Sequence, residues 1–185
     1  MSKLKHKKNS TENFHTPPDI NKLTLKITTL ALLSALSISI SFLESLIPPL
    51  PFFPPGAKLG LANIIIMFTA YRFSFFEAML IAIIKSLFVL ITRGFSAFIL
   101  SLAGTILSAL ITSVLLRLKI KKQIPFIIIG LIGGIAHNIG QCFAAYFYIG
   151  KNILYYAPLL LVFGVATGIL TGILLQLICL KIKKT

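Results

Sequence analysis

Four ionisable side chains lie inside apolar stretches of this sequence: Glu44, Glu77, Lys85 and His137. A charged group at the depth of a bilayer is costly unless it is paired or solvated, so each one is a candidate for ligand or ion binding. Glu77 begins its apolar stretch and can reach the interface by extending its side chain. Lys85 is eight residues further on, about 12 Å along a helix. It therefore needs an anionic partner, either Glu44 or a bound anion.

A second polar group surrounds His137. The stretch 133–141 reads GGIAHNIGQ, in which all residues but the two isoleucines are small or polar. The spacing of His137 and Asn138 from Gln141 is four and three residues, so the three side chains are expected on one side of a helix. Such a group either hydrogen-bonds neighbouring helices or lines a ligand cavity, and the adjacent glycines favour the cavity.

A third candidate lies in the stretch 54–63, which reads PPGAKLGLAN. Proline and glycine fix a loop, Lys58 starts a helix, and helix-terminal amides attract anions. Asn63 follows within the same segment. Arg93 ends the next apolar stretch on the same face, so that Lys58, Arg93 and the deeper Lys85 together predict a basic outer vestibule. The alternative is three ordinary interface anchors.

The sequence lacks the residues that several kinds of chemistry require. The sequence has no G-x-x-x-x-G-K-[ST] loop for ATP, and its single aspartate, Asp19, cannot form the pair that holds Mg²⁺ on a diphosphate. Cys142 and Cys179 match no metal or redox spacing. We therefore expect no catalytic residue, no metal site and no cofactor, and hence no enzyme.

Composition places these residues in a membrane protein. Of 185 residues, 57% are hydrophobic and 12% charged, where a soluble domain carries about 25% charged residues. The net charge of +14 comes from short basic clusters between apolar runs. No basic stripe is interleaved with aromatics, so nucleic-acid binding is not expected.

Six apolar segments predict an all-α, six-helix transmembrane domain over residues 22–184, preceded by a disordered cytoplasmic tail, residues 1–21. The second segment is short for a span, and residues 117–122 read as a basic connector. The segments are 23–47, 57–70, 75–92, 96–116, 124–148 and 153–180.

The distribution of Lys and Arg predicts orientation. With both termini inside, fourteen basic residues face the cytoplasm and three the outside. Cytoplasmic loops are enriched in Lys and Arg, so both termini are expected in the cytoplasm of a multi-pass plasma-membrane protein.

Small residues recur every fourth position in two segments, at Gly164, Gly168 and Gly172, and at Ala31 and Ala35. Such stripes let another helix approach closely. The partner is either a helix of the same bundle or one of another subunit.

The stretches 55–64 (PGAKLGLANI), 101–104 (SLAG) and 133–141 resemble the bacterial membrane family labelled heptaprenyl diphosphate synthase component I, also called Gx transporter. The resemblance covers about residues 25–180. That family is similar to the S components of energy-coupling factor transporters, six-helix proteins that capture small molecules and dock on a coupling transmembrane subunit with two ATPases. The resemblance implies that Ala31 and Ala35 form the docking face.

The expected function is a substrate-binding subunit for uptake of a small anionic molecule. Lys58, Lys85 and Arg93 would attract it, and the orienting residues would be Asn63, His137, Asn138 and Gln141. The rival is a non-catalytic membrane partner of a prenyl synthase or redox system, and a stand-alone channel is a third class. Isoprenoid phosphates, quinone precursors and flavin-like or thiamine-like molecules all remain open as ligands.

Overall fold

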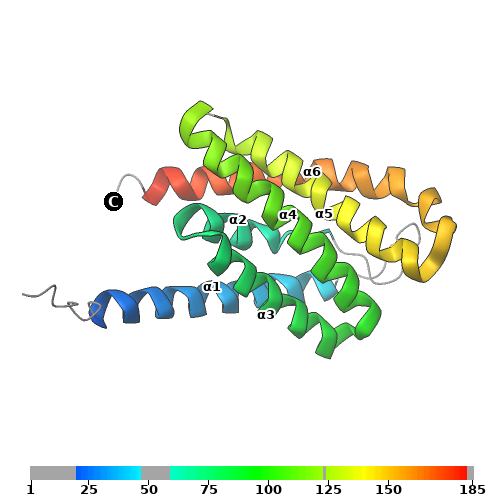
Figure 1. Ribbon diagram of the computed structural model, residues 1–185, viewed down its shortest axis with the longest axis horizontal. Coiled ribbons are helices and arrows are strands. Elements are labelled where there is room, and N and C mark those ends of the chain that lie inside the picture. The colour runs from blue at the N-terminus through cyan, green and yellow to red at the C-terminus, as the bar shows by residue number, and fades with distance from the viewer. Residues whose placement is uncertain (1–19, 47–58, 123, 183–185) are drawn as a thin grey trace, which may run out of the picture.

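The computed structural model describes residues 20–46, 59–122 and 124–182, and all regular structure in these ranges is helical (Figure 1). The expected all-α class is therefore confirmed for this part of the chain, whereas the count of six spans is not. Its elements are α1 (Ile20–Leu46), α2 (Asn63–Arg72), α3 (Phe75–Arg93), α4 (Phe95–Lys122), α5 (Phe126–Ile149), the 3₁₀ helix η1 (Gly150–Tyr155) and α6 (Ala157–Ile182).

Five of these helices, α1, α3, α4, α5 and α6, are long and apolar enough to cross a membrane. The second predicted span is instead represented by α2, which has 10 residues and a length of about 15 Å, half the hydrocarbon thickness. Six of its residues are buried, so α2 is a short helix enclosed by its neighbours. Gly60 turns the backbone just before α2, with φ of +85°, a conformation that glycine adopts without strain.

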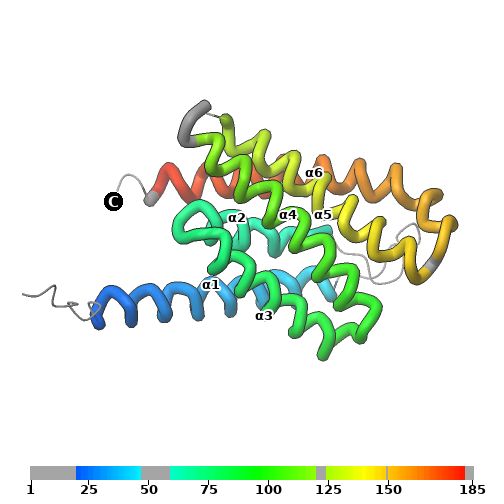
Figure 2. Tube along the Cα trace, viewed as in Figure 1, coloured from blue at the N-terminus to red at the C-terminus, as the bar shows by residue number. Residues whose placement is uncertain are grey.

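The helices run back and forth between two ends of the bundle (Figures 1 and 2). One end carries the start of α1, the turn from α2 to α3 and the end of α6, at the left of both pictures; we call it the Lys22 end. The other end carries the corner from α3 to α4 and the helix η1; we call it the Arg93 end. The first and last helical residues described thus lie at the same end.

The basic connector predicted at 117–122 is helical, because α4 continues to Lys122. The helix outlasts its apolar run because Leu, Arg and Lys are good helix formers outside the membrane as well. Lys119 Nζ donates to the Ile124 carbonyl at 2.6 Å and lies 4.0 Å from the centre of the Phe126 ring, which holds the turn into α5. At the other boundary, α1 begins at Ile20, within the range predicted as tail.

Glycines set the distance between α5 and α6. A Cβ atom at Gly168 would lie 2.7 Å from the Gly130 carbonyl oxygen, and one at Gly164 would lie 2.9 Å from that of Gly134. Backbone therefore packs directly on backbone, as small residues permit in membrane helices. The stripe of α6 serves packing within the bundle, the first of the two alternatives.

Candidate binding site

Lys85 lies in the middle of α3 and is 1% exposed. Its Nζ donates to Asn63 Oδ1 of α2 at 3.1 Å and to Thr105 Oγ1 of α4 at 3.3 Å. An ammonium group so deep is stable only with polar partners. Three helices therefore converge on one lysine, and both of its hydrogen-bond acceptors are neutral.

Glu44, the carboxylate expected as an alternative partner, is buried near the end of α1. Its Oε1 accepts a hydrogen bond from the backbone N–H of Leu61, which ties α1 to the turn before α2. Within residues 20–46, 59–122 and 124–182, however, no Lys85–Glu44 pair reaches 4.0 Å. Contact with a carboxylate therefore does not neutralise Lys85 in this part of the chain.

Glu77, by contrast, has a basic partner at the Lys22 end. It forms an ion pair with Lys26 of α1 at 2.5 Å and accepts a hydrogen bond from Ser74. This pair joins α1 to the start of α3 and is remote from Lys85, about 12 Å along α3.

His137 and Gln141 of α5 are each 1% exposed, and the Gln141 amide nitrogen lies 2.6 Å from His137 Nε2. The imidazole ring packs against two glycines. A Cβ at Gly60 would lie 2.8 Å from His137 Cδ2, and one at Gly104 would lie 2.8 Å from His137 Cε1. Both glycines are therefore needed to admit the ring between α4 and the turn before α2.

Gly60 also lies close to Asn63, since its Cβ would come within 3.1 Å of the Asn63 amide nitrogen. The lysine and the histidine thus belong to one buried group around the start of α2. We call it the polar cluster; its members are Asn63, Lys85, Thr105, His137 and Gln141. Gly60, Gly104 and Thr105 were not singled out from the sequence as site residues, although the two glycines lie in the quoted stretches 55–64 and 101–104.

The side chain of Asn138 contacts a different helix from the side chains of His137 and Gln141. Its side-chain nitrogen donates to the Leu160 carbonyl of α6 at 2.5 Å, while its Oδ1 is buried with no partner among the described residues. The amide nitrogen therefore serves the contact of α5 with α6, as the interhelical alternative expected. A role of Asn138 in ligand binding remains a prediction that rests on its Oδ1 alone.

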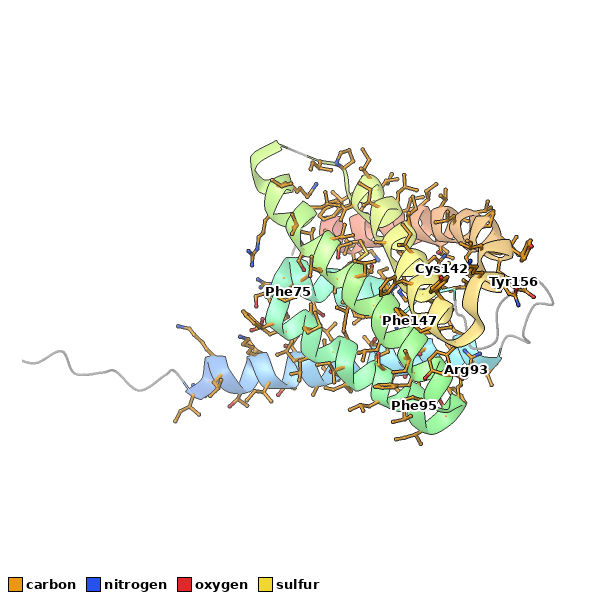
Figure 3. The ribbon with its side chains drawn as sticks, turned by 45° about the vertical axis from the view of Figure 1, so that its right-hand side comes forward. Phe75, Arg93, Phe95, Cys142, Phe147 and Tyr156 are labelled. Atoms are coloured by element: carbon orange, nitrogen blue, oxygen red, sulfur yellow. The ribbon has the colours of Figure 1, made fainter. Side chains whose placement is uncertain are left out.

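The basic vestibule is only partly within the described residues. Lys58 lies outside them. Arg93 is half-buried at the end of α3, and Figure 3 shows it at the same end of the bundle as Phe95 and Tyr156 and far from Phe75. Arg93 follows Lys85 by eight residues, or about 12 Å along the helix, so the two cations occupy different depths.

The small-residue face of α1 is open. Ala31 and Ala35 are exposed, and only 11% of the apolar window of α1 is buried, against 33–50% in the other long helices. The buried residues of α1 are Leu33, Ser37, Ser41 and Glu44. The two alanines therefore take no part in packing within the bundle described.

Cysteines and metal ligands add no further candidate within the described ranges. Cys142 and Cys179 are free thiols. No group of three or more His, Cys, Asp or Glu side chains in residues 20–46, 59–122 and 124–182 is placed to hold a metal ion.

Long apolar helices around a buried polar cluster define a multi-pass α-helical membrane protein. More specifically, the chain belongs to the heptaprenyl diphosphate synthase component I family, whose sequence model matches residues 33–178. This confirms the resemblance carried by its three motifs. No curated protein and no solved structure matches the chain.

The bond from Leu61 to Glu44 gives a test of how the site is held together. We expect Glu44→Ala to lower the free energy of unfolding by about 1–3 kcal/mol, because the Leu61 N–H loses its acceptor. Glu44→Gln keeps an acceptor oxygen and should cost less. Thermal unfolding in detergent measures both, with Ser45→Ala as a control on the adjacent residue. Equal losses for Ala and Gln would show that the carboxylate charge, and not the hydrogen bond, is what matters.

Proposed function

We propose that this chain is a membrane-embedded binding subunit that captures a small anionic molecule for uptake. The observation that carries the proposal is the buried ammonium of Lys85, which has two neutral acceptors and no carboxylate in contact among the described residues. Burying a charge without an opposite charge is costly. A bound anion supplies that charge.

The polar cluster has suitable groups to orient such a ligand. Lys85 contributes charge, Asn63 and Gln141 contribute amides that both donate and accept, and His137 contributes an imidazole. In this proposal Arg93 and Lys58 attract the anion from the Arg93 end, and Asn138 offers its Oδ1. The ligand is defined by its charge and its small size, which leaves the classes named from the sequence open.

Removal of the buried charge tests this proposal. Small molecules extracted from the purified wild-type protein should include an anion that mass spectrometry finds reduced about 10- to 100-fold in Lys85→Met, since a charge-assisted contact contributes about 1–3 kcal/mol. Lys85→Arg should retain part of it. Lys151→Met, the same change on an exposed residue, is the control. An extract from folded Lys85→Met equal to that of wild type would refute the proposal.

Orientation follows from the placement of charge. The Lys22 end carries Lys22, Lys26, Arg72, Arg117, Lys119 and Lys181, whereas the Arg93 end carries Arg93 and Lys151 among the described residues. The excess of Lys and Arg marks the cytoplasmic side. The Lys22 end then faces the cytoplasm of a plasma-membrane protein, the ligand enters from outside, and α2 forms part of the second of six crossings.

Reporter fusions test that orientation. After Lys181, a reporter that works only in the cytoplasm should be active. After Lys151, a reporter that works only outside the cell should be active. The opposite pattern at both sites would place the polar cluster's entrance on the cytoplasmic side.

The open face of α1 supports a docking role in the same proposal. Ala31 and Ala35 lie on the outside of the bundle, where a helix of a coupling transmembrane subunit with its ATPases can approach closely. We expect the double variant Ala31→Leu/Ala35→Leu to fold with unchanged thermal stability, because neither alanine is packed internally, and to lose co-purifying partners.

The matched control for the docking test is Ala166→Leu, the same enlargement at an exposed position of α6. It should keep every partner. If the α1 double variant also keeps them, the face contacts lipid only and docking takes place elsewhere.

The family description itself favours a second candidate, a non-catalytic membrane partner of a heptaprenyl diphosphate synthase. In that case the polar cluster fixes the helices and binds no ligand. The partners recovered in the α1 experiment discriminate the two, since ATPase and coupling subunits favour uptake while a soluble prenyl synthase favours this alternative. Under both candidates we expect no prenyl-transfer chemistry from the chain itself, because its sequence lacks the aspartate pair that holds Mg²⁺ on a diphosphate.

A further inference from the structure

A cavity separate from the polar cluster lies at the Lys22 end, between the turn from α2 to α3 and the second half of α4. Its volume is about 200 Å³. Apolar side chains form part of its wall, and four lining residues carry polar side chains, namely Tyr71, Ser74, Ser113 and Arg117. Ser113 follows Thr105 of the polar cluster by eight residues, about 12 Å along α4. The cavity is therefore a second site at a different depth.

The buried wall of this cavity holds a hydroxyl group without a partner. Ser113 is 7% exposed, and its Oγ has no hydrogen-bond partner among the described residues. A serine or threonine in a helix commonly donates to the carbonyl four residues earlier. The neighbouring Thr112 does so, at 2.7 Å from the Ser108 carbonyl. A buried hydroxyl left unsatisfied costs free energy, so the Ser113 hydroxyl is available to a ligand in the cavity.

Arg117 gives the cavity a positive charge that no described carboxylate neutralises. It follows Ser113 by four residues and so lies on the same side of α4. The acidic residues in the described ranges are Glu44, which is near the far end of α1, and Glu77, which is paired with Lys26. Neither forms an ion pair with Arg117 in these ranges. The guanidinium therefore keeps its charge for another partner.

Tyr71 adds a second hydroxyl from the end of α2. Its ring packs edge-on against Phe126 of α5, with 5.2 Å between the ring centres, which restrains the side chain. Ser74 already donates to Glu77, so it is not counted as a donor to a ligand. The cavity thus offers one guanidinium and two hydroxyls, and all three groups can donate hydrogen bonds.

These donors match a group that carries negative charge on several oxygens. A guanidinium binds phosphate and carboxylate oxygens through paired N–H donors, and a tetrahedral phosphate has further oxygens for the two hydroxyls. The volume is below the roughly 300–1,000 Å³ of pockets for drug-sized ligands, which favours a small group. We propose that this cavity binds one phosphate group, either of free phosphate or of a phospholipid headgroup.

A phosphate in this cavity has a structural consequence. Its contacts with Tyr71 on α2 and with Ser113 and Arg117 on α4 would join the two helices at the Lys22 end. The ligand at the polar cluster, by contrast, is held about 12 Å deeper along α4. The phosphate site therefore does not rest on the proposed function, and it holds equally for an uptake subunit and for a synthase partner.

Thermal unfolding of the purified full-length protein in phosphate-free detergent tests the site. Inorganic phosphate, chloride at matched ionic strength and phosphatidylglycerol are added in separate titrations. We expect the unfolding temperature to rise with phosphate or with phosphatidylglycerol but not with chloride, because only a bound ligand stabilises the folded state in this way. A rise with phosphate identifies the free ion as the ligand, and a rise with phosphatidylglycerol alone identifies the headgroup.

Variants of the cation locate the site. Arg117→Ala should weaken the apparent affinity for the stabilising ligand by about tenfold or more, since it removes a charge-assisted contact. Arg117→Lys keeps the charge without the paired N–H donors and should bind with intermediate affinity. The control is Arg72→Ala, which removes an exposed cation at the same end that does not line the cavity. It should bind like the wild type.

Ser113→Ala separates ligand binding from a role in the fold alone. Without ligand, this variant should unfold at the same temperature as the wild type or at a higher one, because it removes an unsatisfied buried hydroxyl. With ligand, its affinity should be weaker by about two- to tenfold. If Ser113→Ala instead lowers the unfolding temperature equally with and without ligand, the hydroxyl serves the fold and the proposal is wrong.

Other results would also overturn the proposal. Stabilisation by chloride equal to that by phosphate and phosphatidylglycerol would mean a general effect of salt. A loss of affinity in Arg72→Ala equal to that in Arg117→Ala would mean that the ligand responds to the basic surface as a whole. The absence of any shift of the wild type with either ligand would mean that the cavity binds no phosphate group.

Discussion

The burial of one ammonium group constrains most of this structure. Lys85 cannot reach either membrane surface, so the chain must bring acceptors to it. Asn63 and Thr105 do so from α2 and α4, and α2 can approach only because the backbone turns at Gly60. The same turn leaves room for the His137 ring. α2, α3, α4 and α5 therefore enclose a buried polar cluster beside an apolar core that includes Met67 and Ile81.

Close helix contacts supply the rigidity that such a site needs. An apolar side chain gains little free energy when it moves from lipid into a contact between helices, because both surroundings are apolar. Association of membrane helices therefore depends on close packing and on interhelical hydrogen bonds. The glycines of α5 and α6 provide the first, and the bond from Asn138 to Leu160 provides the second. By contrast α1 packs on the bundle through Leu33 and through the ring of Phe42 on Phe88, and it is tied by Glu44 and Lys26. A smaller share of α1 is buried than of the other long helices.

The sequence predicted much of this arrangement for identifiable reasons. Apolar runs between turn residues located α3, α5 and α6 closely, and the depth of Lys85 within its run predicted its burial. Hydropathy could not show that α4 extends through Arg117 to Lys122, because that extension depends on helix propensity.

The details of the site depend on relations that spacing cannot reveal. The contact of Lys85 with Asn63 joins residues 22 apart in the chain and requires the turn at Gly60. Thr105 was missed because a threonine in an apolar helix is usually bonded to its own backbone. Asn138 and Gln141 were expected to act together, but the rotation of α5 directs the Asn138 amide nitrogen to α6.

The short length of α2 has a consequence for biogenesis. Ten residues extend about 15 Å and cannot cross the hydrocarbon by themselves. The translocon can release α1 and α3 as independent spans, since each is long and apolar. α2 has no such independence, because its buried residues require α3 and α4 around them. It must therefore reach its place after α4 has been synthesised, which makes the assembly of the polar cluster a late event in folding.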